Sequence, residues 1–356
     1  MNIFNIMDYG ADSRGLVDST TAIQKAIDDA STVEGKVIVP PGNYLTSKLY
    51  LKGKGISIEG AASWSYRGFG GSILTLNDSN VDCLIDITGA FGVSIINLNL
   101  NGNNLGKDID GIKLSWDKYN GGSEEDTPKI DGCKIAYFSG NGINFNHVWC
   151  FSIRHSMIAY NKGNGLVIDG WDGFILDNWF SYNEGYGIKG ANVVASINFT
   201  SNRIEWNKLG GINIGFGDSL NITGNFFDRS EGPAIILGGE KGVSLVTITS
   251  NIFRRNGSNI NDGFNSSQLR LINTSNITVT SNTSRVGRND GGGGNLSPNY
   301  GFVLEDNKNI VVANNTLEKG ALKELVIDIN NSNSIIKDNI GSITDENYST
   351  GSDLLN

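Results

Sequence analysis

One six-residue pattern recurs in the chain, as in Asn202-Arg203-Ile204-Glu205-Trp206-Asn207, Asn225-Phe226-Phe227-Asp228-Arg229-Ser230 and Asn251-Ile252-Phe253-Arg254-Arg255-Asn256. Related segments begin at Ser156, Asn178 and Asn315. Each is a short alternating strand followed by a turn, and the period is about two dozen residues. One such unit cannot bury its apolar face alone, so neighbouring units must stack. The pattern therefore predicts an all-β solenoid.

The first residue of the pattern forms a column of mostly asparagines. Its members are Cys133, Ser156, Asn178, Asn202, Asn225, Asn251, Asn282, Asn315 and Asn339. Stacked asparagine side chains can hydrogen-bond from coil to coil. We therefore expect this column to be structural rather than catalytic.

Residues 1–60 differ from the rest and are expected to form an N-terminal cap and the first coils. Residues 18–30 predict a short amphipathic helix, and Thr21 and Gln24 have the spacing of a capping box. A helix over the open end of a solenoid protects the first coil from water and from strand addition. In this one-domain reading, residues 61–343 form the β-helix body and residues 344–356 a polar, loose tail.

Composition and charge limit the partners. The 356 residues carry a formal net charge of -9, and no run of Lys and Arg is present, which disfavours nucleic acid. No apolar stretch approaches the length of a membrane span, and no signal peptide is visible at the N-terminus, so localisation stays open. Three scattered cysteines, Cys83, Cys133 and Cys150, predict neither a disulfide framework nor a zinc site. We predict no cofactor and assign no metal ligands. Calcium dependence stays open, because Asp172, Asp177 and the Glu124-Glu125-Asp126 loop could bind calcium although no ligand spacing demands it.

Four long loops interrupt the repeat. Two insertions, residues 257–268 and 287–299, leave the coil at the same turn, and residues 115–128 and 63–71 form two more loops. Loops of this length on a regular scaffold are commonly walls of binding sites.

The opening of the chain carries a family resemblance. It combines Asp8-Tyr9-Gly10-Ala11, the segment from Asp18 to Ile27, and Val37-Ile38-Val39-Pro40-Pro41-Gly42-Asn43-Tyr44. This module resembles that of the pectate-lyase-like right-handed parallel β-helix superfamily, which includes pectate lyase 3 and glycoside hydrolase family 28-related proteins. The resemblance implies a right-handed parallel β-helix and a poly- or oligosaccharide partner. It does not settle a reaction, because this scaffold hosts lyases, hydrolases, epimerases and adhesins.

Several catalytic signatures of that superfamily are missing. With two histidines, His147 and His155, the chain lacks the Gly-His-Gly of polygalacturonases, and it lacks the motifs of calcium pectate lyases. The epimerase pattern Tyr-Gly-Phe-Asp-Pro-His has a remote counterpart in Asn141-Gly142-Ile143-Asn144-Phe145-Asn146-His147. An amide replaces the acid there, which disfavours an epimerase.

The repeat itself suggests a site. Alternation places the residue after the apolar Ile204 or Phe227 on the outer face, so Glu205 and Asp228 should lie side by side on adjacent coils, about 4.8 Å apart. Carboxyl groups about 5–5.5 Å apart suit a retaining glycosidase or transglycosidase. The sequence thus predicts Glu205 and Asp228 as the catalytic pair. A surface charge ladder of these acids with neighbouring arginines is the alternative.

Aromatic and basic residues accompany this pair. Flat apolar sugar faces pack on aromatic rings, and arginines can position a substrate. The predicted saccharide-binding residues are Trp179, Tyr160, Tyr182, Trp206, Arg203, Arg229, Arg254 and Arg255. A tyrosine ladder with a structural role is the alternative.

A second candidate centres on Gly170-Trp171-Asp172-Gly173, flanked by Asp169 and Asp177. Arg154 and Asp177 occupy matching strand-end positions, so we expect an Arg–Asp pair there that is either structural or faces the substrate. His155, Lys113 or Lys189 could serve a lyase, because β-elimination needs a base and a cation near a uronate carboxylate.

The sequence hypothesis is a glycoside hydrolase or transglycosidase that cleaves or transfers glycosidic bonds of a polysaccharide. The alternatives are a lyase acting on uronate-containing glycans and a non-catalytic glycan-binding or phage tail-type module. A monomer and a homo-oligomer, a trimer included, both remain open.

Overall fold

The structure is a computed structural model that describes residues 2–61, 65–66, 68–116, 126–294, 296–317 and 326–340. The expected tail, residues 344–356, and most of the 115–128 loop lie outside the described residues. The chain divides into two compact units, unit 1 (Met1–Trp179) and unit 2 (Phe180–Asn356), and each is described by itself.

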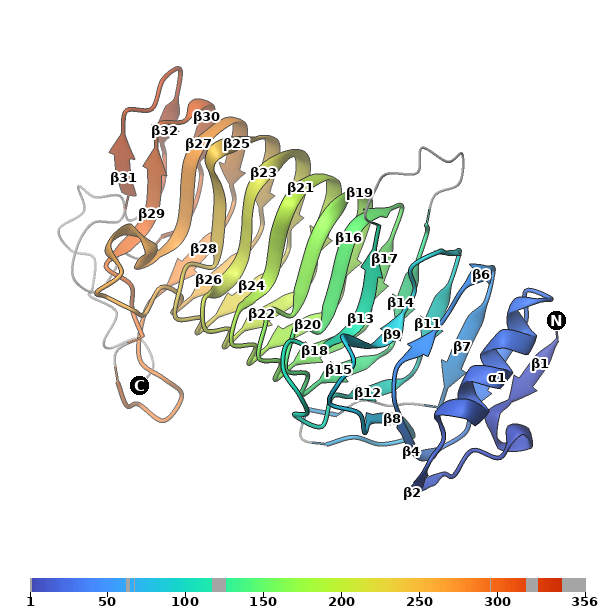
Figure 1. The fold of residues 1–356 in the computed structure, drawn as a ribbon. Helices are drawn as coiled ribbons and strands as arrows, with labels where there is room; N and C mark the ends of the chain where they lie inside the picture. Colours follow the sequence, from blue (N-terminus) through green and yellow to red (C-terminus); the bar gives the residue numbers. More distant parts are fainter. Residues whose placement is uncertain are drawn as a thin grey trace. The chain divides into compact units, whose positions relative to one another are not determined.

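Unit 1 contains a first helix and a succession of short strands (Figure 1). Its elements are β1 (Ile3–Asn5), η1 (Ile6–Tyr9), β2 (Arg14–Asp18), α1 (Thr20–Ser31), β3 (Lys36–Val39), β4 (Gly42–Thr46), β5 (Leu49–Tyr50), β6 (Gly53–Lys54), β7 (Ser57–Gly60), β8 (Ser72–Leu76), β9 (Cys83–Asp86), β10 (Ala90–Phe91), β11 (Ser94–Ile96), β12 (Asn99–Asn101), β13 (Asp110–Ser115), β14 (Lys129–Asp131), β15 (Lys134–Ala136), β16 (Ile143–Trp149), β17 (Ser152–Arg154), β18 (Met157–Ala159) and β19 (Leu166–Leu176).

Unit 2 follows β20 (Trp179–Ser181), which spans the boundary. Its elements are β21 (Tyr186–Thr200), β22 (Arg203–Glu205), β23 (Gly210–Thr223), β24 (Phe226–Asp228), β25 (Ile235–Thr249), β26 (Ile252–Arg254), η2 (Gly263–Asn265), β27 (Ser267–Thr280), β28 (Thr283–Arg285), β29 (Tyr300–Glu305), β30 (Lys308–Ala313), β31 (Val326–Ile329) and β32 (Ile335–Lys337).

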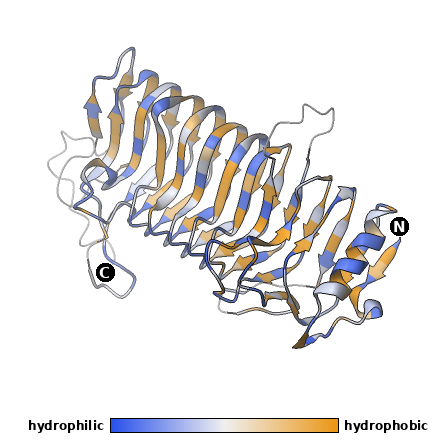
Figure 2. Cartoon of the chain, viewed as in Figure 1, coloured by the Kyte–Doolittle hydropathy of each residue, from blue (hydrophilic) through white to orange (hydrophobic). Residues whose placement is uncertain are grey.

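Both units are stacks of parallel strands, which confirms the predicted parallel β-helix. In unit 2 the main sheet pairs β21, β23, β25 and β27 in order, while the short sheet pairs the three-residue strands β22, β24, β26 and β28. In unit 1 the main sheet includes β9, β13, β16 and β19, and the short sheet includes β12, β15 and β18. Apolar and polar residues alternate along the strands (Figure 2), so one face of each strand fills the interior.

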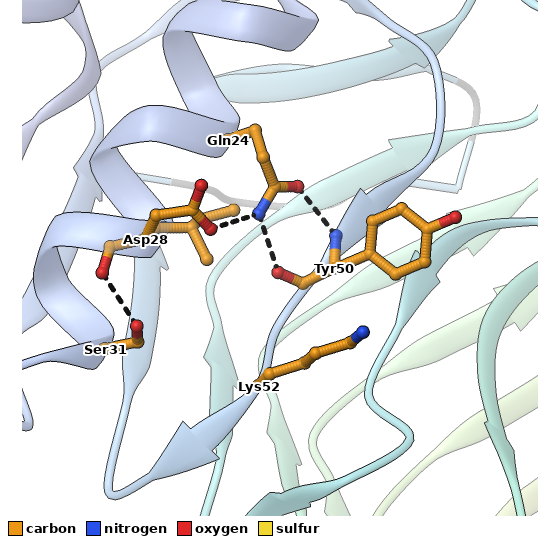
Figure 3. Close-up of a pocket in the computed structure, with 6 residues that line it drawn as sticks. Gln24, Asp28, Ser31, Tyr50 and Lys52 are labelled. Carbon is orange, nitrogen blue, oxygen red and sulfur yellow. Dashed lines mark hydrogen bonds between the residues drawn. The ribbon is translucent and has the colours of Figure 1, made fainter.

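The predicted N-terminal helix is confirmed as α1. It packs on β1, β3 and β5 with Ile23, Ala26, Ile27 and Ala30 buried. The expected capping box is wrong, because Asp18 rather than Thr21 accepts from a helix-start amide, Thr20 N, at 3.0 Å. Gln24 instead reaches the next strand, where its side chain accepts from Tyr50 N at 2.8 Å and donates to Tyr50 O at 2.9 Å (Figure 3). The helix is thus fastened to β5.

The asparagine column forms the predicted ladder. In unit 2 the Nδ2 of Asn225 donates to Oδ1 of Asn251 at 3.0 Å, and its own Oδ1 accepts from Nδ2 of Asn202 at 3.0 Å. The same bond joins Asn251 to Asn282 at 3.0 Å. Each of these side chains is buried, so the ladder satisfies polar groups that water cannot reach.

The short strands β20, β22, β24 and β26 are each followed by a residue in the left-handed backbone region. In unit 2 these residues include Tyr182, Trp206, Arg229 and Arg255, with φ of 54°, 57°, 57° and 54°. Large side chains adopt this conformation uncommonly, and it costs about 1–2 kcal/mol per residue. The repeated turn brings successive side chains of this column over one another, which decides how the candidate site is covered.

Candidate active site

Glu205 and Asp228 are neighbours, as predicted. They are direct Cα partners on β22 and β24. The expectation that they are open to solvent is wrong, because Glu205 is 3% and Asp228 is 0% exposed. Arg203, two residues before Glu205 on the same face, donates to the Glu205 carboxylate from Nε at 2.9 Å and Nη2 at 2.8 Å.

Asp228 is covered by two arginines and by the 287–294 part of an insertion. Arg255 donates to its two carboxylate oxygens from Nε at 2.9 Å and Nη2 at 2.7 Å, and Arg229 bonds it through Nη1. Both arginines also bond Asp290 of the insertion, and Arg255 donates to Arg288 O at 2.7 Å. In this arrangement Arg229 and Arg255 hold an acid and a loop, rather than facing an open groove.

The predicted aromatic residues of unit 2 stack on one another. The rings of Tyr182 and Trp206 lie 5.4 Å apart at an interplanar angle of 5°. The Arg229 guanidinium lies 4.9 Å from the Trp206 ring centre. Trp206 is therefore sandwiched, while Tyr182 remains exposed.

The predicted aromatic residues of unit 1 are partly covered by a loop. Tyr160 stacks on Tyr137, with ring centres 5.3 Å apart, and Trp179 packs on Tyr66 at 5.0 Å. The buried Lys134 donates to the carbonyls of Ser65 and Gly68 and so fastens the segment that carries Tyr66.

The second candidate site, around residues 169–173, also contains His147, which the sequence had not assigned to it. His147, at the end of β16, lies with Nδ1 3.0 Å from Asn146 Oδ1 and 3.4 Å from Asp169 Oδ2. The carboxyl-bearing Asp169 is buried, whereas the His147 side chain is 30% exposed. The His147 ring lies 6.3 Å from that of Trp171. Sequence reasoning named Asp169 and Trp171 but missed His147, although the epimerase-like segment 141–147 was a signal.

The expected pairing of Arg154 with Asp177 is wrong by one residue. The Cα partner of Arg154 is Leu176, and Arg154 Nε donates to Ser152 Oγ at 2.8 Å. His155 instead lies 2.8 Å from Asp131 and 3.8 Å from Asp177. His155 is thus held on the surface by two acids.

Lysines and acids line a hollow of about 290 Å³ on the main sheet of unit 1. Lys113 Nζ lies 2.9 Å from Asp82, and Lys48 Nζ lies 2.7 Å from Asp82 and 2.8 Å from Asp86. Burial acts to lower the pKa of Lys113, but the hydrogen bond to Asp82 and the negative charges of Asp82 and its neighbours together raise it. Lys113 therefore stays cationic beside the hollow.

An adjoining hollow of about 260 Å³ lies between α1 and β5 (Figure 3). Gln24, Asp28 and Lys52 line it, and it shares Lys52 and Tyr50 with the first hollow. The remaining lysine candidate, Lys189 of unit 2, donates to Asn213 Oδ1 at 3.1 Å, and burial lowers its pKa.

Within the described ranges, no three His, Cys, Asp or Glu side chains gather closely enough to hold a metal ion. No helix in that part of the chain is long and apolar enough to cross a bilayer. The three cysteines are free.

The parallel coils define a pectate-lyase-like protein, and comparisons agree. A sequence model of the family "Rhamnogalacturonase A/epimerase, pectate lyase-like" matches residues 3–236. The chain belongs to this family.

Solved structures share the fold. The A-module of mannuronan C-5 epimerase AlgE6 from Azotobacter vinelandii has a similar fold, with a TM-score of 0.74 at 18% identity, covering 97% of each chain. DFA-IIIase from Arthrobacter chlorophenolicus A6 without its lid gives a TM-score of 0.67 at 15% identity, covering 97% of this chain and 99% of that one. The predicted right-handed parallel β-helix is thus confirmed.

Curated relatives are similar over part of their length. Mannuronan C5-epimerase AlgE1 of Azotobacter vinelandii is 29% identical over 206 residues, which are 55% of this chain and 14% of that protein. Alginate lyase 7 of the same organism is 28% identical over 211 residues, 54% of this chain and 24% of that protein. The chain thus spans a small fraction of the length of either relative.

Proposed function

We propose that the protein is a polysaccharide-modifying enzyme that removes the C5 proton of a uronate residue. The observation that carries the proposal is the contact of His147 with Asp169 on the main sheet of unit 1. If Nδ1–H points at the oxygens of Asp169 and Asn146, Nε2 keeps its lone pair and can accept a proton. That atom has no hydrogen-bond partner among the described residues.

A cation near the histidine supports the proposal. Lys113 lies on β13, whose Ser115 is the Cα partner of Asn146. Adjacent strands are about 4.8 Å apart, so a sugar ring can reach both the hollow of Lys113 and the His147 ring. A lysine that neutralises the uronate carboxylate makes the C5 proton more acidic. Trp171 offers an apolar surface for the ring.

The same proton abstraction leads to two outcomes. When the electron pair left at C5 expels the oxygen on C4, a C4=C5 double bond forms and the chain is cleaved, as in a lyase. When a proton returns to the opposite face of C5, the chain stays intact and the uronate is epimerised. Similarity to proteins named mannuronan C5-epimerase and alginate lyase supports both outcomes. Similarity to proteins named epimerases therefore supports including epimerisation, which the sequence motif disfavoured, among the proposed outcomes.

The two histidines of the chain offer a matched test. Polymannuronate and polygalacturonate are incubated with the native protein, His147→Gln and His155→Gln. Ultraviolet absorbance reports the unsaturated product, and NMR reports the C5 configuration. His147→Gln is expected to lose about 10²-fold or more in rate, and His155→Gln to keep its rate. Equal rates in the two variants would contradict the role of His147.

Glycoside cleavage by Glu205 and Asp228 is the second candidate, favoured by their direct pairing on β22 and β24. It requires the 287–294 segment, Arg229 and Arg255 to move off Asp228, after which Tyr182, Trp206, Arg203 and Arg254 of unit 2 would contact the sugar. Tyr160 and Trp179 remain predicted saccharide contacts of unit 1. Mass spectrometry separates the candidates, because hydrolysis adds water to the product and elimination does not. A glycan-binding or tail-type module would bind glycan and release no product.

A further inference from the structure

Two arginines of unit 2 face each other on adjacent strands. Arg254 of β26 and Arg285 of β28 are direct Cα partners, about 4.8 Å apart. Neither forms an ion pair with a described residue. Like charges directly opposite on neighbouring strands destabilise a sheet. The pair therefore costs stability unless an anion lies between the guanidinium groups.

The described surroundings leave this pair without compensation. The nearest acid among the described residues of the ladder is Asp228, the Cα partner of Arg254 on the other side, but its oxygens already accept from Arg229 and Arg255. The Nε atom of Arg254 is buried and has no hydrogen-bond partner in the described part of the chain. Burial lowers the pKa of Arg254, and Arg255, Arg229 and Arg285 lower it further against the effect of Asp228. The local charge is thus positive.

An apolar surface adjoins the two arginines. Phe226 and Ile252 are Cα partners on β24 and β26, and Ile252 is 41% exposed. The Arg254 guanidinium lies 6.0 Å from the Phe226 ring centre and that of Arg203 lies 4.6 Å from it, so Phe226 is partly covered and Ile252 is the more open surface. Apolar sugar faces pack on such side chains, whereas a small inorganic anion makes no use of them. Guanidinium forks match carboxylates with two parallel hydrogen bonds.

We infer that Arg254 and Arg285 form a binding site for a carboxylate of an acidic saccharide, whose ring rests on Phe226 and Ile252. The site shares no residue with the His147 site of unit 1. Its test measures binding without turnover, so its failure and the failure of the proposed function are distinguishable.

The test measures the affinity of an oligogalacturonate for the native protein, Arg254→Gln, Arg285→Gln and Lys308→Gln by calorimetry. Lys308 is exposed on β30 of the main sheet, so its replacement removes the same charge elsewhere in unit 2. Each arginine variant is expected to bind about tenfold more weakly, since a hydrogen bond to a charged group is lost. Lys308→Gln should bind like the native protein, and the oligosaccharide with its carboxyl groups reduced to alcohols should not compete.

Three results would overturn the inference. They are native-like binding by both arginine variants, equal weakening by Lys308→Gln, and competition by the reduced oligosaccharide. Inorganic sulfate is titrated alongside, and binding of sulfate without binding of oligogalacturonate would also overturn it.

Unfolding at low salt without ligand gives a further readout. Arg285→Gln should be more stable than the native protein, because a repulsion is removed; a loss of stability would indicate a structural arginine.

Discussion

Glu205 and Asp228 are direct partners on β22 and β24, yet their carboxylates are held by different arginines. Arg203 holds Glu205 along its own strand, while Arg255 holds Asp228 from the next coil. The two acids lie on adjacent strands and lack access to solvent. The arginine that holds Glu205 is partly exposed, whereas the arginine that holds Asp228 is buried. Stability should therefore depend more strongly on Asp228 than on Glu205.

We predict that Asp228→Asn lowers the free energy of unfolding by about 3–5 kcal/mol, because the buried Arg255 then keeps only the exposed Asp290 as a counter-charge. Glu205→Gln should cost about 0–1 kcal/mol, since the Arg203 side chain is 42% exposed and can turn to water. Urea denaturation of the two variants measures both values. Equal losses would show that Asp228 is not the anchor of this cluster.

The outcome for Glu205 and Asp228 illustrates what the sequence can predict. The period of the apolar residues places the two acids on neighbouring coils, and the asparagines line up because each coil repeats the same turn. Alternation does not reveal where a three-residue strand ends. The left-handed Trp206 and Arg229 therefore could not be foreseen, since such turns are usually marked by Gly, Asn or Asp. The cover over Asp228 comes from Asp290, 61 residues after Arg229, and no local pattern encodes that contact.

His147 shows the same limit at the other candidate site. Residues 141–147 and Asp169 were each visible in the sequence, but their meeting depends on the register of β16 and β19, in which Asn146 is the partner of Asp169. That register shifts between Asn146 and Val148. A one-residue irregularity of this kind redirects a side chain and cannot be read from the spacing.

The asparagine ladder should depend on each buried member. Asn225 donates to Phe199 O at 2.8 Å as well as to Asn251. Asn225→Ala is expected to cost about 1–3 kcal/mol for each buried group left unsatisfied. Asn192→Ala, at an exposed position of β21, is the control and should change stability by less than about 0.5 kcal/mol. Thermal unfolding compares them, and similar melting temperatures would contradict a structural ladder.

The loop before α1 should make stability depend on pH at the acid end. The side chain of Arg14 and the amide of Leu16 bond Asp12 and lower the pKa of its carboxyl to about 2. Because the folded pKa lies below the unfolded value of about 3.9, this stabilisation is complete above pH 4 and is lost as the pH falls toward 2. Asp12→Asn should flatten that part of the stability curve. An unchanged slope between pH 4 and 2 would assign the acid sensitivity to other groups.

Lys134 should control access to the aromatic residues of unit 1. Its buried ammonium donates to Ser65 O at 2.9 Å and Gly68 O at 2.7 Å, and these residues flank Tyr66, which packs on Trp179. Lys134→Met keeps the apolar stem and removes the donors, so the amides of Ser65, Tyr66 and residues 68–70 should exchange hydrogen faster and Trp179 should become easier to quench.

Another partly buried lysine, Lys36, provides the control for Lys134→Met. Lys36 of β3 is half-buried and paired with Glu59 at 2.7 Å, away from the 65–70 segment. Lys36→Met should leave both readouts as in the native protein, and a Trp179→Phe background identifies the quenching signal. If Tyr66 covers a sugar platform, Lys134→Met should also bind oligosaccharide more tightly. Slower hydrogen exchange would contradict the role of Lys134 in holding the segment. Faster exchange with weaker oligosaccharide binding would mean that Tyr66 contacts the sugar rather than covering its binding site.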